Sequence, residues 1–242
     1  MTALTLAVAE TRLILRNRTV LVTAAVLPIA MAIAVGRSNL GAVSESGGSL
    51  AAVQLGMLLL FGVLMPITMT LAARRQQRYL KRLRSSPAST ASIVAGLAGP
   101  LVLIVAVQAV IVFAVMAWLG NAGPEHPELL VLAFANGAVT SVALGFLTAS
   151  FTKSPEAAQI TVIPATLVFM VGLFLGLAPI DGARSVLAAA VPGASLTELT
   201  RLAWDGSPDG YAAAVRPLVL STIVAVAAAL LAARLFRWQP RA

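Results

Sequence analysis

The stretch ASIVAGLAGPLVLIVAVQAVIVFAVMAW, residues 91–118, carries no charged side chain. An α-helix rises about 1.5 Å per residue, so a stretch of this length can cross the roughly 30 Å of hydrocarbon in a bilayer. Its apolar residues do not alternate with polar ones as in a half-buried strand, and lipid offers peptide groups no hydrogen-bond partners. The stretch therefore predicts a transmembrane helix.

Five further uncharged stretches have the same character. The chain is 59% hydrophobic and only 11% charged, whereas a soluble domain carries about 25% charged residues. Its mean hydropathy is +0.93. We predict an all-α membrane protein, a single domain over residues 1–242, with six transmembrane helices at residues 19–35, 50–73, 91–118, 129–151, 157–177 and 217–233.

The distribution of charge predicts the orientation of these helices. With the N-terminus in the cytoplasm, 13 of the 17 Lys and Arg residues fall in cytoplasmic segments and seven of the nine acidic residues fall in outer ones. This is the positive-inside pattern, and it places both termini in the cytoplasm. A cleaved signal peptide is disfavoured because its removal would put the two terminal cation clusters on opposite sides. The net charge of +8 then reflects cytoplasmic loops, and we expect no nucleic-acid partner.

Three connecting segments have features of their own. Residues 1–18 predict an amphipathic helix in the cytoplasmic interface, with Arg12 and Arg16 towards lipid headgroups, although a frayed basic tail is an alternative. Residues 178–216 form a long, rather apolar outer segment and predict two short re-entrant or interfacial helices. The chain ends in a basic cytoplasmic tail, residues 234–242.

The segment RRQQRYLKRLRSSPAS, residues 74–89, is the most basic part of the chain. It has six cations within eleven residues, and Tyr79 contributes to an apolar face of a predicted short helix. The helix should end before Pro87, because proline disfavours helix in the preceding residue. Two interpretations remain open: contact with anionic lipid, and docking of a cytoplasmic protein partner.

The sequence contains few of the residues that catalytic and metal-binding sites need. The chain has no Cys and one His, His126, so thiol chemistry and multi-histidine metal sites are excluded, and no catalytic residue is assigned. A nucleotide-binding P-loop needs Gly-Lys-Ser/Thr, but Lys81 follows Leu80 and Lys153 follows Thr152. No ionisable residue lies inside a predicted span, which disfavours coupling to an ion gradient. The energy source is therefore expected on another chain.

Polar and small residues within the spans predict contacts between helices. Gln54, Thr68, Gln159 and Thr161 are candidates for lining a translocation path, the alternative being hydrogen bonds between helices. Small residues recur every four positions, which favours close packing within the chain, or at a subunit interface as the alternative. These residues are Ala133, Gly137, Ser141, Gly145 and Ala149; Gly172 and Gly176; and Ser221, Ala225, Ala229 and Ala233.

The order of these features resembles ABC type-2 permeases, the membrane subunits of type V ABC exporters. The likeness rests on the basic helix before the first span and on the stretch 74–89, which is similar to the family's basic segment ending in Leu-x-x-Ser-Pro. It rests also on SFTKSPEAAQ at 150–159, the entry to the fifth span, and on VPGASLTELTR at 191–201, before the last one.

The resemblance implies roles for particular residues. The helix with Arg12 and Arg16 would be the connecting helix, and Pro192, Glu198 and Arg201 would belong to an outer gate. The residues that would couple the permease to an ATPase are Arg74, Arg75, Arg78, Tyr79, Lys81, Arg82 and Arg84.

The resemblance also implies partners and a function. Two permeases, identical or paralogous, would pair with two separate ABC ATPase subunits that bind ATP and Mg²⁺, while this chain carries no cofactor. The first hypothesis is export of a hydrophobic or amphipathic compound, such as a drug or antibiotic, across a bacterial cytoplasmic membrane. Export of a lipid or polysaccharide, and a non-transporting membrane partner of the ATPase, are the alternatives.

Overall fold

The structure, a computed structural model, describes residues 30, 33–34, 46–77, 89–120, 123–178 and 188–235. Within these residues no strand occurs, so the predicted all-α class is confirmed for this part of the chain. The elements are α3 (Gly47–Leu59), the π-helical turn η2 (Leu60–Leu64), α4 (Met65–Gln76), α6 (Thr90–Trp118), α7 (Pro127–Phe151), α8 (Pro155–Thr161), α9 (Ile163–Leu175), α11 (Ala194–Asp205) and α12 (Ala212–Leu235).

Five helical stretches in the described part of the chain are long and apolar enough to cross a membrane. They correspond to the second to sixth predicted spans, with helix ends that differ by a few residues: Gly47–Gln76, Ser92–Trp118, Pro127–Phe151, Pro155–Leu175 and Ala212–Leu235. The first predicted span, residues 19–35, lies outside the described residues except for residues 30, 33 and 34. The predicted interfacial helix and C-terminal tail also lie outside them.

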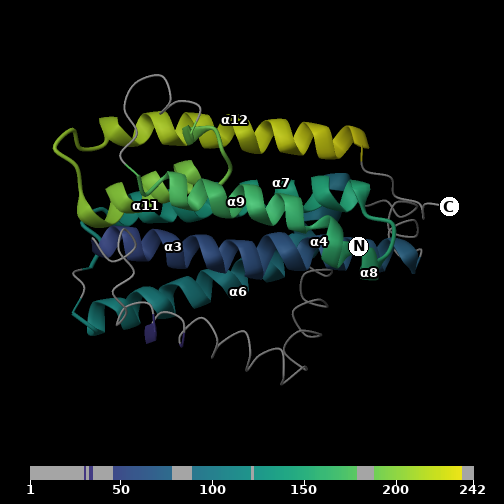
Figure 1. The fold of residues 1–242 in the computed structure, drawn as a ribbon, viewed down its shortest axis with the longest axis horizontal. Coiled ribbons are helices and arrows are strands. Elements are labelled where there is room, and N and C mark those ends of the chain that lie inside the picture. The colour runs from purple at the N-terminus through teal and green to yellow at the C-terminus, as the bar shows by residue number, and fades with distance from the viewer. Residues whose placement is uncertain are drawn as a thin grey trace.

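The long helices lie side by side and form an elongated bundle with two distinct ends (Figure 1). Helix α7 packs against α12 on one side and against α4 on the other, while α6 packs against the rod made by α3, η2 and α4. At the end we call the basic end, the described charged residues are Arg74, Arg75, Lys153, Glu156 and Arg234. Towards the other, which we call the acidic end, they are Glu125, Glu128, Glu198, Arg201, Asp205, Asp209 and Arg216.

Serine residues define where three of the helices begin. Ser46 Oγ accepts a hydrogen bond from Ser49 N at 3.0 Å, Ser89 Oγ from Ser92 N at 3.1 Å, and Ser154 Oγ from Ala157 N at 3.2 Å. The first amides of a helix have no partner within the helix, and a serine at the N-cap satisfies one of them. These caps set the starts of α3, α6 and α8.

Two prolines alter the membrane helices from within. Pro66 has no N–H for the carbonyl four residues before it, and the preceding turn is π-helical: Met65 N–H donates to Leu60 O. The fifth predicted span is divided into α8 and α9 at Val162, because Pro164 likewise withdraws a backbone donor. Neither span is therefore a straight, continuous α-helix.

The small residues of α7 serve packing within the chain, as the first interpretation of the stripe predicted. Ala133, Ser141 and Ala149 are fully buried. A Cβ added at Gly137 would lie 2.7 Å from Leu59 Cδ1 and 2.8 Å from Leu196 Cδ1. One at Gly145 would overlap the side chain of Ile67. Helices α3 and α11 therefore pack against this stripe at Gly137, and α4 packs against it at Gly145.

The buried face of α12 follows a different register from the predicted stripe. Ser221 and Ala225 are buried, but Ala229 and Ala233 are exposed, and Ala228 and Ala232 are buried in their place. The helix has 3.6 residues per turn, so a strict four-residue spacing drifts off a straight face within two or three turns. Packing within the chain is therefore not found at Ala229 and Ala233, and a subunit interface at these two residues stays a prediction.

We predict that Gly145→Ala destabilises the fold. Its Cβ would overlap Ile67 and lie 3.1 Å from the carbonyl oxygen of Leu64, which forces α7 and α4 apart. The matched control is Gly99→Ala in α6, where a Cβ meets nothing within 4 Å and should add about 1 kcal/mol of helix propensity. Thermal unfolding in detergent should show a lower midpoint for the first variant only. Equal midpoints would contradict this packing.

Candidate functional site

Arg75 is buried at the basic end of the bundle, where it links α4 to the C-terminus of α7. Helix α4 carries it to a position where only 1% of its surface is exposed. Its Nη1 donates to Ala149 O at 3.1 Å, and its Nη2 donates to Thr152 O. The last carbonyls of a helix lack partners within the helix and carry a partial negative charge. A guanidinium, with five donors in a planar fork, can satisfy two of them together.

The same corner also holds α8. Thr152 Oγ1 lies 2.7 Å from Thr161 Oγ1, and each hydroxyl also bonds to a carbonyl of its own helix, Thr148 O at 2.9 Å and Ala157 O at 3.0 Å. The C-terminus of α4, the C-terminus of α7 and α8 are therefore tied together. We call Arg75, Thr152 and Thr161 the basic-end clamp.

Two of the residues predicted to couple the permease to an ATPase, Arg74 and Arg75, lie at the clamp. Arg74 is half-buried on the last turn of α4, and Arg75 is inside the bundle, away from any docking surface. The other predicted coupling residues and the connecting-helix residues lie outside the described residues: Arg78, Tyr79, Lys81, Arg82, Arg84, Arg12 and Arg16.

The four candidate path residues lie in different environments. Gln54 is buried in α3, and its Nε2 has no hydrogen-bond partner among the described residues. Thr68 is buried and its Oγ1 donates to Leu64 O at 2.9 Å. Gln159 is exposed on α8, while Thr161 belongs to the clamp. None of the four lines either of the two cavities described below.

The segment before α11 penetrates the bundle from the acidic end. The chain leaves α9 at that end, reaches the Pro192–Gly193 turn against the middle of α9, and returns along α11. A Cβ at Gly172 would overlap the carbonyl of Pro192, so the missing side chain allows this approach. Gly193 has a φ of 99°, a conformation that glycine adopts without strain. The second predicted outer helix is thus found as α11, while residues 179–187 lie outside the described residues.

Two further predicted gate residues lie on α11. Arg201 Nη1 donates to Leu177 O at 3.0 Å and to Gly176 O at 3.3 Å, which caps the C-terminal end of α9. Glu198 is half-buried. Burial raises the pKa of the Glu198 carboxyl, and the positive charges of Arg216 and Arg201 act in the opposite direction.

Asp205 joins the end of α11 to the start of α3. Its carboxylate accepts a hydrogen bond from Gly48 N at 2.9 Å and from Ser46 Oγ at 2.7 Å. A carboxylate at a helix N-terminus meets free amides and the positive end of the helix dipole. Sequence reasoning did not assign this role to Asp205, because 157 residues separate it from Gly48. The only local signal was Ser46, three residues before the Ser49 amide that it caps.

The α6–α7 connection completes the acidic end. His126 N donates to Ala203 O at 2.9 Å. Tyr211 Oη donates to Glu128 Oε1 at 2.6 Å, and this bond raises the pKa of the tyrosine hydroxyl. His126 Nδ1 lies 3.3 Å from the same carboxylate oxygen. The one histidine of the chain thus contacts Glu128 and Tyr211, and the described residues contain no group of three or more His, Cys, Asp or Glu side chains that could hold a metal ion.

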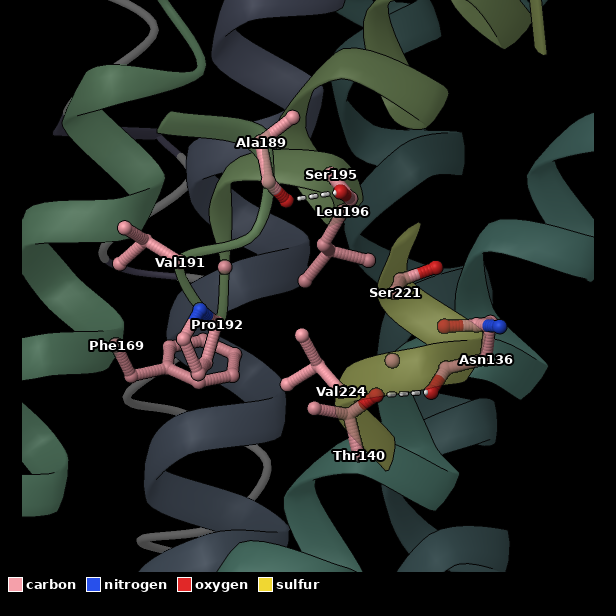
Figure 2. Close-up of a pocket in the computed structure, with 12 residues that line it drawn as sticks. Asn136, Thr140, Phe169, Ala189, Val191, Pro192, Ser195, Leu196, Ser221 and Val224 are labelled. Atoms are coloured by element: carbon pink, nitrogen blue, oxygen red, sulfur yellow. Dashed lines mark hydrogen bonds between the residues drawn. The ribbon is translucent and has the colours of Figure 1, made fainter. Parts of the chain in front are cut away.

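A small cavity lies under the Pro192–Gly193 turn, between α7, α9, α11 and α12. Figure 2 shows Pro192 and Val191 on one side of it, and Asn136, Thr140 and Ser221 on the other. Its free space is about 10 Å³, enough for roughly one water molecule. Asn136 lines this cavity and also a larger groove on the outside of the bundle.

We predict that Arg75→Met destabilises the bundle by about 2 kcal/mol or more, because hydrogen bonds from a charged donor are worth about 1.5–3 kcal/mol each. The matched control is Lys153→Met, which removes an exposed cation at the same end. Thermal unfolding in detergent and limited proteolysis should distinguish the two variants. Equal stability of both would show that the clamp does not hold α4 to α7.

The family model described as ABC-2 type transporter matches residues 2–192, which is more than half of the chain. No curated protein and no solved structure matches the chain significantly. The matched region includes the basic segment after α4, the clamp and the Pro192 turn. Together with the five apolar helices of the described residues, this match shows that the chain belongs to the ABC-2 type transporter family of membrane permeases.

Proposed function

We propose that this chain is the permease subunit of an ATP-driven exporter for a hydrophobic or amphipathic compound. Members of the ABC-2 family normally work with an ABC ATPase, and this chain has no nucleotide-binding loop of its own. The observation that carries the proposal is the basic end. There, α4 extends to Gln76, and the sequence continues after it with the segment 78–84, which contains four further cations.

The charge distribution supports a cytoplasmic basic end. Four of the five described charged residues at the basic end are cations, whereas five of the seven towards the acidic end are carboxylates. Cytoplasmic loops of membrane proteins carry the excess of Lys and Arg. We infer a bacterial cytoplasmic membrane, with both termini and the basic segment in the cytoplasm.

The assembly would contain two permeases and two ATPase subunits. ATP and Mg²⁺ would bind to the ATPases, and their closure would favour one state of the permease pair by differential binding. The basic-end clamp supports this mechanism, because Arg75 joins the helix that leads into the docking segment to α7 and α8. A displacement of the C-terminal turn of α4 would therefore be passed to α7 through Arg75.

The cargo class follows from the walls of the bundle. Between their charged ends, the five described spans carry no ionisable side chain. An apolar wall suits a hydrophobic or amphipathic molecule, so drug or antibiotic efflux is the first candidate, with the Pro192 turn and α11 as the gate on the outer side. Polysaccharide usually stacks on aromatic side chains, and aromatic residues make up only 5% of this chain.

We predict that Arg78→Glu with Arg82→Glu weakens binding of the cognate ATPase by at least about tenfold, because the two reversals replace attraction by repulsion at one docking surface. Co-purification of the tagged permease and the ATPase measures this. The matched control is Arg237→Glu with Arg241→Glu, which makes the same charge change in the other cytoplasmic segment. Undiminished co-purification of the first variant would refute docking at segment 74–84.

We also predict that apolar compounds stimulate ATP hydrolysis by the reconstituted complex. Liposomes containing the permease and the ATPase are tested with a panel of apolar and amphipathic dyes, and ATPase liposomes without the permease are the control. A transporter changes its hydrolysis rate when cargo binds, since cargo and nucleotide favour the same states. A complex that forms but does not respond to any dye would indicate a non-transporting partner.

A further inference from the structure

A groove runs along the outside of the bundle between α7 and α12. It has a volume of about 370 Å³ and is distinct from the cavity under the Pro192 turn. Ala225 is buried to 3% exposure, whereas Val139 and Val226 on either side of the groove are 59% and 51% exposed. Small buried residues and large exposed ones together produce a concave apolar surface, and its volume falls in the usual range of about 300–1,000 Å³ for ligand sites.

A polar pair interrupts this apolar surface. Asn136 Nδ2 donates to Thr222 Oγ1 at 2.9 Å, and Thr222 Oγ1 donates in turn to Leu218 O at 2.7 Å. The bond between Asn136 and Thr222 is exposed at the groove. An asparagine side chain has two donor hydrogens and an acceptor oxygen. The contact with Thr222 uses one hydrogen, so the Asn136 amide keeps a second donor hydrogen and its Oδ1 acceptor.

The depth of Asn136 makes this polar pair unusual. It lies nine residues into α7 from Pro127, which corresponds to about 13 Å along the helix axis from the acidic end. That distance is close to half of the roughly 30 Å hydrocarbon thickness. An amide facing hydrocarbon without partners is costly, and polar groups at this depth usually face protein or a ligand pathway.

We propose that the α7–α12 groove binds an amphipathic small molecule with an apolar body and one hydroxyl, amine or amide group, which hydrogen-bonds to Asn136. This inference rests on the proposed function and deepens it, because it names a site and a polar requirement for the cargo. A membrane phospholipid fits less well: its polar groups lie at the bilayer surface, and its acyl chains at the depth of Asn136 carry no hydrogen-bonding group.

The position of Asn136 connects this site to the outer turn. Asn136 is a lining residue of both the groove and the cavity under Pro192, and Figure 2 shows it beside Ser221 of α12 and Thr140 of α7. Asn136 therefore lies between the groove and the cavity under the Pro192 turn.

Photolabelling of the full chain in lipid nanodiscs tests the proposal without an ATPase. The probe is 1-amino-5-azidoanthracene, which carries the amine that the site requires, and 1-aminoanthracene and anthracene are the competitors with and without a polar group. We expect adducts concentrated on α7 and α12 at the groove, and stronger competition by 1-aminoanthracene. Asn136→Leu should lower groove labelling about fivefold, the factor that corresponds to one net hydrogen bond of about 1 kcal/mol.

Two variants provide the controls. Gln108→Leu removes an amide at a similar depth from α6, which does not line the groove, and it should leave labelling unchanged. Ala229→Phe adds bulk at an exposed position in the groove and should abolish labelling while leaving the fold intact. Even labelling of all lipid-facing helices, or full labelling of Asn136→Leu, would overturn the proposal.

A second copy of the chain could occupy the groove instead of a small molecule. Cysteine cross-linking distinguishes the two. The natural chain contains no cysteine, so Ala229→Cys is a single-cysteine variant. We expect no disulfide-linked dimer on oxidation in the membrane; efficient cross-linking at this position would make the groove an interface and overturn the small-molecule site. Because these experiments use the permease alone, loss of ATPase binding would refute the proposed function without changing the labelling result.

Discussion

A peptide group inside hydrocarbon must find its hydrogen-bond partner within the protein, and the ends of the helices are where this requirement is hardest to meet. In the described part of the chain, charged side chains meet it at both ends of the bundle. Asp205 accepts from the first amides of α3, and Arg75 donates to the last carbonyls of α7. Each places its charge at the helix end of opposite polarity, so each contact closes a helix and joins it to another element.

Close packing depends on residues that have almost no side chain. At Gly145 the side chain of Ile67 in α4 packs against α7, and at Gly172 the carbonyl of Pro192 packs against α9. In a membrane the hydrophobic effect does not drive helices together, because lipid is as apolar as the side chains. Close van der Waals packing at small residues provides the attraction instead. The Pro192 turn enters the bundle because α9 offers glycine at that height. The Pro192 turn, the cavity beneath it and the groove are consequently neighbours, because Asn136 lines both the cavity and the groove.

The two ends have different parts in the function we propose. The basic end would join the docking segment to α7 through Arg75, and α7 also carries Asn136, about two-fifths of the way along the helix from the acidic end. One rigid helix therefore runs from the ATPase side to the candidate cargo site, and it borders the Pro192 turn there. Motion of the ATPase and binding of cargo would act on the same element, which is the physical basis that coupling between distant sites requires.

The sequence by itself determined the helical fold class and the five described spans, because apolar length and the absence of charge suffice to identify a membrane helix. It also indicated the family and the small-residue face of α7. The tertiary structure alone decided that Arg75 is buried, that Asp205 caps α3, that the buried face of α12 passes through Ala228 and Ala232, and that Asn136 faces a groove. These facts depend on contacts between residues up to 159 positions apart, and local periodicity carries no information about which helix lies opposite a given face.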